Sequence, residues 1–372
     1  MKILSGPSAH PLFSRCPALR DGMPHVPLGT FPTPVQRLDA LERELDIGEL
    51  WVKRDDLSGT LYGGNKVRKL EFTLADALRS GAREVVTFGG LGSNHALATT
   101  VYARHLRLGV TLFLTPQPVT GHVRRTLLLY HHFGAEVRLA RDADDALERA
   151  RALCDEREAA TGRAPYVVPY GGTTPLATAG MIDAGMELAM QAVHGECPVP
   201  DCVYVAMGSM GTAAGITLGL SVAEFPTEVR AVQVTPESVA SAGRLGDLIE
   251  ATADAMCAFD PGCGCTVSVS TNVRVVDRYV ADGYGTPTPE SRRAMELGAS
   301  AGLVLDETYT AKTLAAIIAD AEAGMLSEAR VVFWDTFDSH DFSAVAVGID
   351  HRALPGEFHP FFEGDPVTGT RD

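Results

Sequence analysis

The sequence lacks the features of several classes of protein. No stretch approaches the roughly 18 consecutive apolar residues of a membrane-spanning helix, and the first residues, MKILSGPSAHPLFSRCP, contain no apolar core of a secretion signal. Basic residues are too few for a nucleic-acid or anionic-membrane footprint, because 32 lysines and arginines face 47 aspartates and glutamates, a formal net charge of −15. We therefore expect a cytoplasmic protein with neither nucleic-acid nor membrane partners.

The sequence also lacks a pattern of cysteine spacing that would predict disulfide bonds. Seven cysteines are odd in number and mostly scattered, which favours a reducing compartment over a disulfide scaffold. Cys257, Cys263 and Cys265 cluster in CAFDPGCGC and could bind a metal, but no second cysteine or histidine pair follows at a usual zinc spacing. We therefore predict no metal site and assign no role to this loop.

Short apolar runs alternate with amphipathic stretches along most of the chain. EVVTFGG precedes NHALATTVYARHLRLG, VTLFLT precedes GHVRRTLLLYHHFG, and DCVYVAMGS precedes MGTAAGITLGLSVAE. This rhythm predicts βαβ units, in which helices flank a mostly parallel sheet. Because 372 residues exceed what one hydrophobic core usually organises, we expect an α/β protein of two lobes with a cleft between them: residues 1–60 and 176–372 form the large lobe and 61–175 the small one.

Lys66 is the first candidate for chemistry. It follows the flexible turn YGGN and opens the helical stretch KVRKLEFTLADALRSG. A lysine in the first turn of a helix experiences the positive end of the helix dipole, which favours the neutral amine that attacks carbonyl groups. Lys66 is therefore suited to a Schiff base, although most lysines beside a glycine turn are simply solvated.

Two further turns lie between a strand and a helix. FGGLGSNHALATT places Ser93 and Asn94 at a helix start, where free N–H groups suit a carboxylate, or where Ser93 simply caps the helix. AMGSMGTAAGITLG forms a small-residue turn whose amides and hydroxyls can surround a phosphate, without the lysine of a Walker A loop. Its candidate residues are Gly208, Ser209, Met210, Gly211 and Thr212.

Two tyrosines lie at expected loop ends. Tyr284 stands between glycines in ADGYGT, and Tyr309 precedes Thr310 where LVLDETYTAK passes from a strand into a helix. Tyrosines in α/β lobes are usually core residues with a hydrogen-bonded hydroxyl. A position at a loop end makes them candidate active-site residues as well.

The order of these motifs resembles one family of enzymes. LGTFPTPVQRLDAL, LWVKRDDLSGTLYGGNKVRKLEF, GSNHALATT, PYGGTTPLATAG, GSMGTAAG and ETYTAK together resemble the 1-aminocyclopropane-1-carboxylate deaminase and D-cysteine desulfhydrase family. That family belongs to the fold type II pyridoxal-phosphate enzymes, which are related to the tryptophan synthase β subunit. The resemblance runs from about Pro27 to about Phe333 and implies the two-lobed fold, with the large lobe binding the cofactor.

The resemblance also implies roles for the candidate residues. Lys66 matches the lysine that binds pyridoxal 5′-phosphate covalently and moves the α-proton. Asn94 matches a hydrogen-bond partner of the cofactor's phenolic oxygen, while Ser93 and His95 would lie beside the substrate carboxylate. The turn Gly208–Thr212 matches the phosphate loop, Tyr284 and Tyr309 match tyrosines facing the substrate, and Thr310 matches the position beside the pyridine nitrogen. The family also implies a homodimer acting on a small amino acid.

Thr310 bears on the choice of reaction. The deaminase branch resembles YEGK at this position, and a carboxylate there would keep the pyridine protonated as a strong electron sink. A threonine hydroxyl holds that proton poorly, which favours β-elimination over opening of a cyclopropane ring; SNH in place of SNQ points the same way. The resemblance thus implies a lyase that releases pyruvate, ammonia and sulfide from D-cysteine.

Several departures from the family pattern leave alternatives open. FWDTFDSHDF stands where relatives have an HTGG-like turn, so Asp335 to Asp338 are expected to reshape the pocket, and DETYT and GSMGT replace DPVYT and GSGGT. The alternatives are deamination of a cyclopropane amino acid, a racemase or β-replacement reaction on a specialised amino acid, and a cofactor-binding protein without turnover.

Overall fold

The computed structural model describes residues 10–263 and 272–367. Contacts within the chain group it into two compact units: the first comprises the chain up to Phe72 with Thr173–Ser339, the second Thr73–Gly172 with the chain from His340 onward. The first boundary thus falls after residue 72, where 60 was expected. The C-terminal segment, expected in the large lobe, groups with the second unit, where Arg124 donates hydrogen bonds to the carbonyl groups of Phe361, Glu363 and Gly364.

A six-stranded sheet forms the centre of the first unit. Its order is β1 (Val35–Arg37), β2 (Glu49–Arg54), β10 (Arg330–Asp335), β7 (Cys202–Met207), β8 (Glu228–Gln233) and β9 (Val273–Val276), parallel except for the β1–β2 pair. Strand β7 is buried throughout, as expected for a parallel strand that helices cover on both faces. The parallel strands end at one edge of the sheet, where the loops after β2, β7 and β10 begin.

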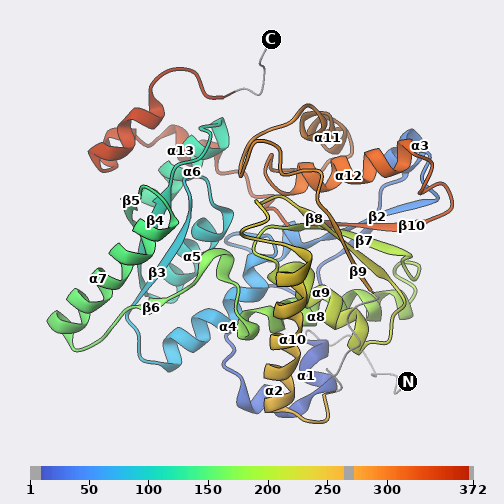
Figure 1. Cartoon of the computed structure of the whole chain (residues 1–372), viewed down its shortest axis with the longest axis horizontal. Helices are drawn as coiled ribbons and strands as arrows, with labels where there is room; N and C mark the ends of the chain where they lie inside the picture. Colours follow the sequence, from blue (N-terminus) through green and yellow to red (C-terminus); the bar gives the residue numbers. More distant parts are fainter. Residues whose placement is uncertain (1–9, 264–271, 368–372) are drawn as a thin grey trace. The chain divides into compact units, whose positions relative to one another are not determined.

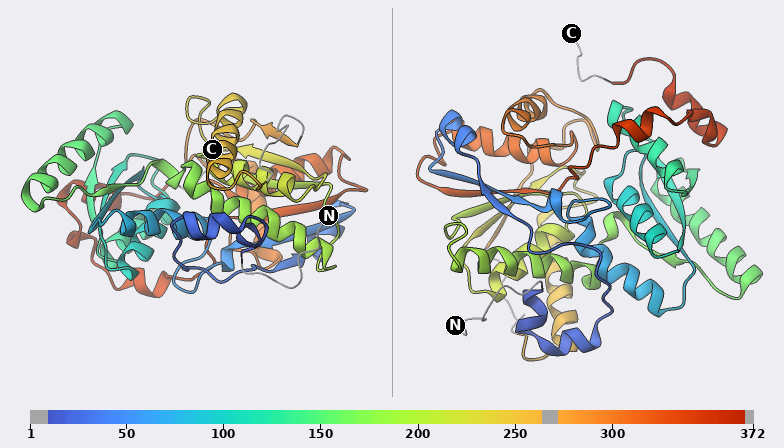
Figure 2. Two further views of the ribbon diagram at one scale, coloured as in Figure 1. Left: turned by 90° about the horizontal axis from the view of Figure 1, so that it is seen from below. Right: turned by 180° about the vertical axis from the view of Figure 1, so that it is seen from behind.

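Helices cover both faces of this sheet (Figure 1). On one face lie α8 (Pro175–Val193), α9 (Gly211–Val222) and α10 (Ala242–Phe259); on the other lie α3 (Asp39–Leu45), α11 (Pro289–Ser300) and α12 (Thr310–Glu322). Each face has its own core, and consecutive residues of β10 divide between them: Trp334 belongs to the α8–α9 core and Phe333 to the α12 core. The short helices α1 (Pro11–Arg15) and α2 (Pro17–Gly22) lie beside α10 (Figure 2).

Helices α8 and α9 approach each other through glycines. A Cβ atom on Gly219 would lie 2.2 Å from the carbonyl oxygen of Ile182, and one on Gly215 would lie 2.3 Å from the Cβ of Met181. Both distances are shorter than any van der Waals contact, so a larger residue would force the helices apart. Close packing of α8 and α9 fixes the start of α9, which follows the small-residue turn.

The second unit contains a smaller parallel sheet. Its order is β5 (Glu136–Leu139), β4 (Gly109–Thr115), β3 (Glu84–Gly90) and β6 (Tyr166–Val167), with helices α5 (Asn94–His105), α6 (Gly121–His132), α7 (Ala143–Thr161) and α13 (Ser343–Val347). Helix α4 (Lys66–Arg79) begins in the first unit and ends in the second. The short 3-10 helices are η1 (Asp55–Leu57), η2 (Tyr170–Gly172), η4 (His351–Ala353) and η5 (Gly356–Phe362). The predicted α/β class with parallel sheets flanked by helices is confirmed.

The cysteines correct one expectation. Cys16 and Cys263 form a disulfide across 247 residues of sequence, and both are buried. Their spacing in the sequence gave no indication of this pair, because only the folded chain brings α1 and α2 to the end of α10. Cys263 therefore does not belong to a metal-binding cluster with Cys257, and Cys265 lies outside the described residues.

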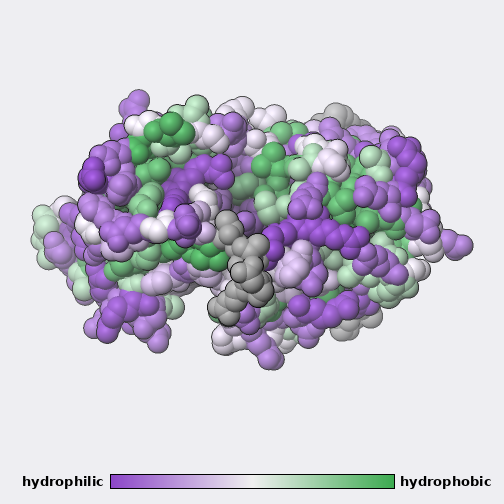
Figure 3. Space-filling model, turned by 90° about the horizontal axis from the view of Figure 1, so that it is seen from above, coloured by the Kyte–Doolittle hydropathy of each residue, from purple (hydrophilic) through white to green (hydrophobic). Residues whose placement is uncertain are grey.

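The described helices are all too short or too polar to span a membrane. Among the helices of residues 10–263 and 272–367, none has the length and apolar character to cross a membrane. The face drawn in Figure 3 mixes hydrophilic residues (purple) with hydrophobic residues (green) over short distances.

Candidate active site

Two glycines explain why a flexible turn precedes Lys66. A Cβ atom on Gly63 would lie 1.9 Å from the carbonyl oxygen of Asp56, and Gly64 adopts a left-handed φ of +86°. No other residue type fits both positions without displacing the backbone. The turn thus packs tightly against η1 and presents Lys66 as the first residue of α4.

The turn after β10 holds this glycine turn in place. Asn65 donates its backbone N–H to the carbonyl oxygen of Thr336 (3.2 Å), and Gly63 donates to Oδ1 of Asp338 (2.6 Å). Asp335 itself is fully buried, and burial together with the charge of Asp56 raises its pKa well above its ordinary value. The unusual sequence FWDTFDSHDF therefore supports the turn that precedes Lys66.

Two lysines lie one helical turn apart on α4. Lys66 is partly buried, and burial lowers its pKa to about 8 against the opposing charge of Asp306. Lys69 is almost fully buried, and burial followed by the charge of Lys66 lowers its pKa well below the ordinary range. Lys66 can therefore supply a neutral amine near neutral pH, whereas Lys69 becomes a cation beside an anion such as a phosphate, whose negative charge favours the protonated amine.

The small-residue turn after β7 lies against Lys69. A Cβ atom on Gly211 would lie 2.7 Å from Nζ of Lys69 and 2.9 Å from Oγ1 of Thr173. Lys69 donates to Oγ1 of Thr173 (2.9 Å), and that hydroxyl lies 2.8 Å from Oγ of Ser209. Gly211 begins α9, so the hydroxyls, the lysine and the helix N-terminus together form a cradle suited to a phosphate.

A hydrogen bond also joins the two turns directly. Asn65 donates through Nδ2 to Oγ1 of Thr212 (2.7 Å). Met210 adopts a left-handed φ of +64° at the N-cap of α9, and such backbone strain is typical of functional loops. The structure therefore brings the start of α4 and the turn Gly208–Thr212 together.

The two candidate tyrosines contact each other. Their hydroxyl groups lie 2.9 Å apart, and the ring of Tyr309 packs on Gly208, where a Cβ atom would lie 2.9 Å from Cε1 of the ring. Burial raises the pKa of Tyr284 to about 12. Tyr284 therefore keeps its proton near neutral pH, as a general acid must.

Asp306 organises the beginning of α12. Its carboxylate accepts hydrogen bonds from the backbone N–H of Thr310 (2.9 Å) and Tyr309 (3.2 Å), and from Oγ1 of Thr310 (2.8 Å). Thr310 is fully buried, so its hydroxyl is held by Asp306. The charge of Asp306 also acts on Lys66 and on the buried Lys312.

Ser93, Asn94 and His95 belong to the second unit. Ser93 caps α5 by accepting a hydrogen bond from the N–H of Ala96 (3.2 Å), and Asn94 is the first residue of that helix. Nε2 of His95 lies 2.9 Å from Oγ1 of Thr87, and His95 is buried. The capping expected for Ser93 is present, and the roles of these three residues toward cofactor and substrate stay predictions.

Sequence reasoning assigned no role to Lys69, Thr173, Asn65 or Asp306. Lys69 lies three residues after Lys66, which places both on one side of a helix, and this spacing was the available signal. Thr173 lies in the quoted motif PYGGTTPLATAG, but its contact with Ser209 joins residues 36 positions apart and required the fold.

A comparison with family models identifies the family of this chain. The model of the pyridoxal-phosphate dependent enzymes matches residues 26–336, which include both lysines, the cradle and both tyrosines. The chain belongs to the pyridoxal-phosphate-dependent enzymes. It is thus an enzyme, and its cofactor is pyridoxal phosphate.

Individual proteins similar to this chain are 1-aminocyclopropane-1-carboxylate deaminase-like proteins and D-cysteine desulfhydrases. A D-cysteine desulfhydrase of Klebsiella pneumoniae is 34% identical over 79% of this chain and 88% of its own length. A Pyrococcus abyssi protein named, provisionally, a 1-aminocyclopropane-1-carboxylate deaminase is 34% identical over 92% of this chain and 95% of its own. A solved structure of a 1-aminocyclopropane-1-carboxylate deaminase homologue matches with a TM-score of 0.75 and 32% identity, over 91% of this chain and 99% of that chain.

The residues present fit the cofactor of this family. Lys69, Thr173 and Ser209 converge at Gly211, whose missing side chain lets the amine and the hydroxyls approach the start of α9 closely. Lys66 offers an amine whose pKa lies within reach of neutral pH. Both the phosphate end and the aldehyde end of pyridoxal phosphate therefore find suitable partners in the first unit.

Proposed function

We propose that this pyridoxal-phosphate-dependent enzyme is a lyase that eliminates a β-substituent from a small amino acid, with D-cysteine as the leading substrate. The observation that carries the proposal is the buried hydroxyl of Thr310, which donates to Asp306 at the start of α12. No carboxylate is offered by residue 310 itself, which favours a weaker electron sink and hence loss of a good leaving group. The similarity to a D-cysteine desulfhydrase supports the same assignment.

The roles of the residues follow from their contacts. The cradle of Lys69, Thr173, Ser209 and Thr212 would hold the phosphate, and Lys66 would hold the other end of the cofactor. When bound, the cofactor supplies an electron sink for the bond broken at Cα. The neutral amine of Lys66 would take the α-proton of the substrate, because its pKa of about 8 allows both protonation states near neutral pH.

The tyrosine pair would serve the leaving group. The pKa of Tyr284 is raised to about 12, so the phenol keeps its proton near neutral pH, and its hydroxyl lies 2.9 Å from that of Tyr309. The protonated phenol of one tyrosine can donate its proton to the departing sulfide. The hydroxyl of the other tyrosine can then pass its own proton to the phenolate that is left. We assign the pair to protonation of sulfide as it leaves, and the helix start at Ser93–His95 remains our predicted carboxylate-binding element.

The first experiment tests the lysine and the reaction together. Purified protein should show a visible-edge absorbance band that borohydride removes, and D-cysteine should release sulfide and pyruvate. Lys66→Ala should lose the band and the activity, and Lys66→Arg serves as the control that retains a cation. Retention of the band in Lys66→Ala would overturn the assignment of Lys66, and a band without sulfide release would overturn D-cysteine as substrate.

Opening of a cyclopropane ring is the second candidate, favoured by the similarity to the Pyrococcus abyssi protein over 92% of the chain. Formation of 2-oxobutanoate from 1-aminocyclopropane-1-carboxylate would support it. Inverted substrate would instead identify a racemase, and a substituted amino acid would identify β-replacement. The homodimer and the cytoplasmic location stay predictions, tested by light scattering and by cell fractionation.

A further inference from the structure

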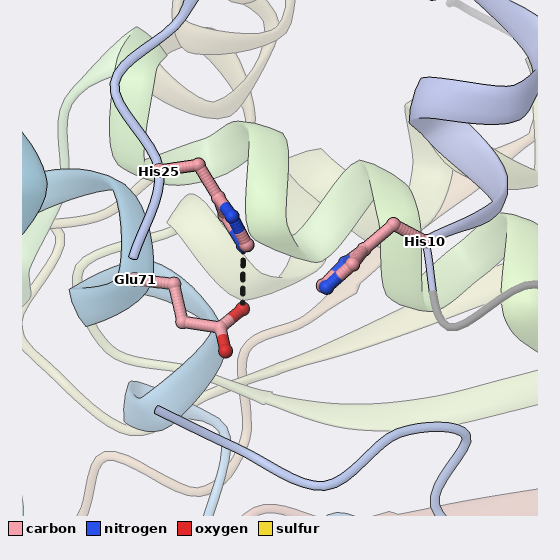
Figure 4. Close-up of side chains that lie close together, drawn as sticks. All are labelled: His10, His25 and Glu71. Carbon is pink, nitrogen blue, oxygen red and sulfur yellow. Dashed lines mark hydrogen bonds and ion pairs between the residues drawn. The ribbon is translucent and has the colours of Figure 1, made fainter. Parts of the chain in front are cut away.

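A cluster of metal-binding side chains lies away from the phosphate cradle, on the N-terminal segment. His10, His25 and Glu71 each direct one donor atom to a common point, and these atoms all lie within 4.8 Å of one another (Figure 4). His10 precedes α1, His25 follows α2, and Glu71 lies on α4. Two imidazoles and one carboxylate form a donor set typical of zinc.

Second contacts hold the three side chains as a metal site requires. Asp183 of α8 lies 3.1 Å from Nδ1 of His10 through Oδ2, and accepts the backbone N–H of Leu12 through Oδ1 (2.8 Å). A carboxylate bound to one nitrogen of a histidine fixes the ring and makes the other nitrogen a better ligand. Asp183 therefore contacts His10 in the same way as the carboxylate that orients a zinc-binding histidine through its other ring nitrogen.

Glu71 divides its two oxygens between different tasks. Oε1 accepts the backbone N–H groups of Leu28 (2.8 Å) and Gly29 (3.0 Å), whereas Oε2 lies 3.3 Å from Nε2 of His25. The backbone contacts fix the carboxylate, and Oε2 faces the histidines. A metal would replace the hydrogen bond between His25 and Glu71 with two bonds to itself.

The surroundings combine an apolar wall with a route from solvent. The rings of Phe13 and Phe72 pack against His25, with centroids 5.3 Å and 5.2 Å away, while Glu71 is 2% exposed. The side chains of His10 and His25 are 20% and 18% exposed, so an ion can reach them. Apolar walls of this kind strengthen binding to a charged ion, because they exclude water.

The charges around His10 are mixed. The carboxylates of Asp183 and Glu71 bring negative charge to the two histidines. The guanidinium of Arg68 opposes this, although Asp55 and Glu187 pair with it at 2.8 Å and 2.9 Å. Because Asp55 and Glu187 neutralise Arg68, the carboxylates of Asp183 and Glu71 make the cluster favourable to a cation.

We propose that His10, His25 and Glu71 bind one divalent zinc ion, with Asp183 orienting His10, and that the ion ties the N-terminal segment to α4. Glu71 lies five residues after Lys66, on the helix that carries both site lysines. The proposal does not depend on the substrate of the enzyme.

Zinc binding to the holoenzyme tests the proposal directly. After dialysis against a chelator, zinc chloride should bind at one tight equivalent per chain by calorimetry and by elemental analysis. His10→Ala/His25→Ala should lose that equivalent. The matched control is His351→Ala/His359→Ala, a second histidine pair with ring centroids 5.8 Å apart, which should retain it. Absence of a tight equivalent in the native protein, or its retention in His10→Ala/His25→Ala, would overturn the proposal.

A second variant guards against loss of folding. Glu71→Gln keeps an oxygen for the N–H groups of Leu28 and Gly29 but places a poor ligand at the other end, so zinc affinity should fall at least about tenfold. Unchanged affinity in Glu71→Gln would contradict the site even if the double variant failed to fold.

Discussion

Lys66 and Lys69 share one helix, but their surroundings give them different chemistry. Lys66 is partly exposed and feels the carboxylate of Asp306, whereas Lys69 is closed in by Thr173 and Gly211. A neutral amine is the group that attacks an aldehyde, and a buried amine that gains a proton beside an anion can bind a phosphate through a charge-assisted hydrogen bond. The difference depends on burial and on neighbouring residues, so only Lys66 was predicted from the sequence, and its role stays a prediction.

The pKa of Lys66 predicts how the protein takes up its cofactor. Because burial lowers this pKa to about 8, the neutral amine becomes the major form as pH rises above 8. The rate at which cofactor-free protein captures pyridoxal phosphate should increase about tenfold from pH 7 to pH 9 and then level off. Stopped-flow absorbance measures this rate. Free Nα-acetyl-lysine is the control, and a protein rate that kept rising beyond pH 9 as this amine's does would contradict the prediction.

Lys69→Met tests the phosphate cradle. The change removes the amine that would carry a positive charge beside the phosphate and shortens the side chain by one atom, so affinity for pyridoxal phosphate should fall about 10- to 100-fold, as expected for a charge-assisted contact. Titration with pyridoxal, which lacks the phosphate, provides the matched control. An equal loss of affinity for both compounds would show that Lys69 does not act on the phosphate.

A buried ion network joins the elements that position these lysines. Glu187 of α8 pairs with Lys53 of β2 and with Arg68 of α4, whose guanidinium also binds Asp55 (2.8 Å). Trp334 of β10 donates to Asp55 (2.8 Å). The network therefore fixes the direction in which α4 leaves its glycine turn.

Removal of one member of the network should destabilise the fold. Glu187→Gln leaves Lys53 and Arg68 buried with one charge too few, and we expect a loss of about 3 kcal/mol in the free energy of unfolding. Denaturant titration measures it. Glu322→Gln, which removes an exposed pair with Arg293, should cause little change. Similar midpoints for the two variants would contradict the prediction.

The same residue predicts a dependence on pH. The positive charges of Arg68 and Lys53 outweigh the upward effect of burial and lower the pKa of Glu187 to about 2, from an ordinary value of 4.5. Its contribution to stability is therefore complete above pH 4.5 and is lost as pH falls toward 2. Glu187→Gln should show a weaker decline of stability in this window than the native protein.

The sequence predicted many of the helices and strands, but it did not predict the side-chain contacts between elements that are distant in sequence. Strand and helix alternation located β3, β4 and β7 and the helices that follow, because buried parallel strands are continuous apolar runs. The network of Glu187 was not predicted, since its members lie as much as 279 residues apart and only the fold brings them together. The same holds for Asp338, which contacts Gly63 across 275 residues.

The largest correction concerns the whole molecule. The disulfide of Cys16 and Cys263 closes a long loop, and in the chain-entropy model such a crosslink stabilises by about 2–5 kcal/mol. Cys16→Ser/Cys263→Ser should lower the thermal midpoint, and a reductant should lower that of the native protein but not that of the variant. Cys154→Ser, at a free cysteine, is the control. The prediction would be contradicted if the native protein, after unfolding and refolding in the presence of a reductant, kept the same thermal midpoint as without it.

The distribution of lysines has a practical consequence for the chemistry of labelling. The sequence contains five lysines, and of the four that the structure describes, Lys53, Lys69 and Lys312 are at most 1% exposed while Lys66 alone is partly exposed. Surface basicity is supplied by arginine, which forms no stable imine. Excess aldehyde or amine-acylating reagent therefore meets almost no competing amines on residues 10–263 and 272–367. Within that part of the chain, a borohydride-fixed adduct should report occupancy of Lys66 without the background that surface lysines give in most proteins.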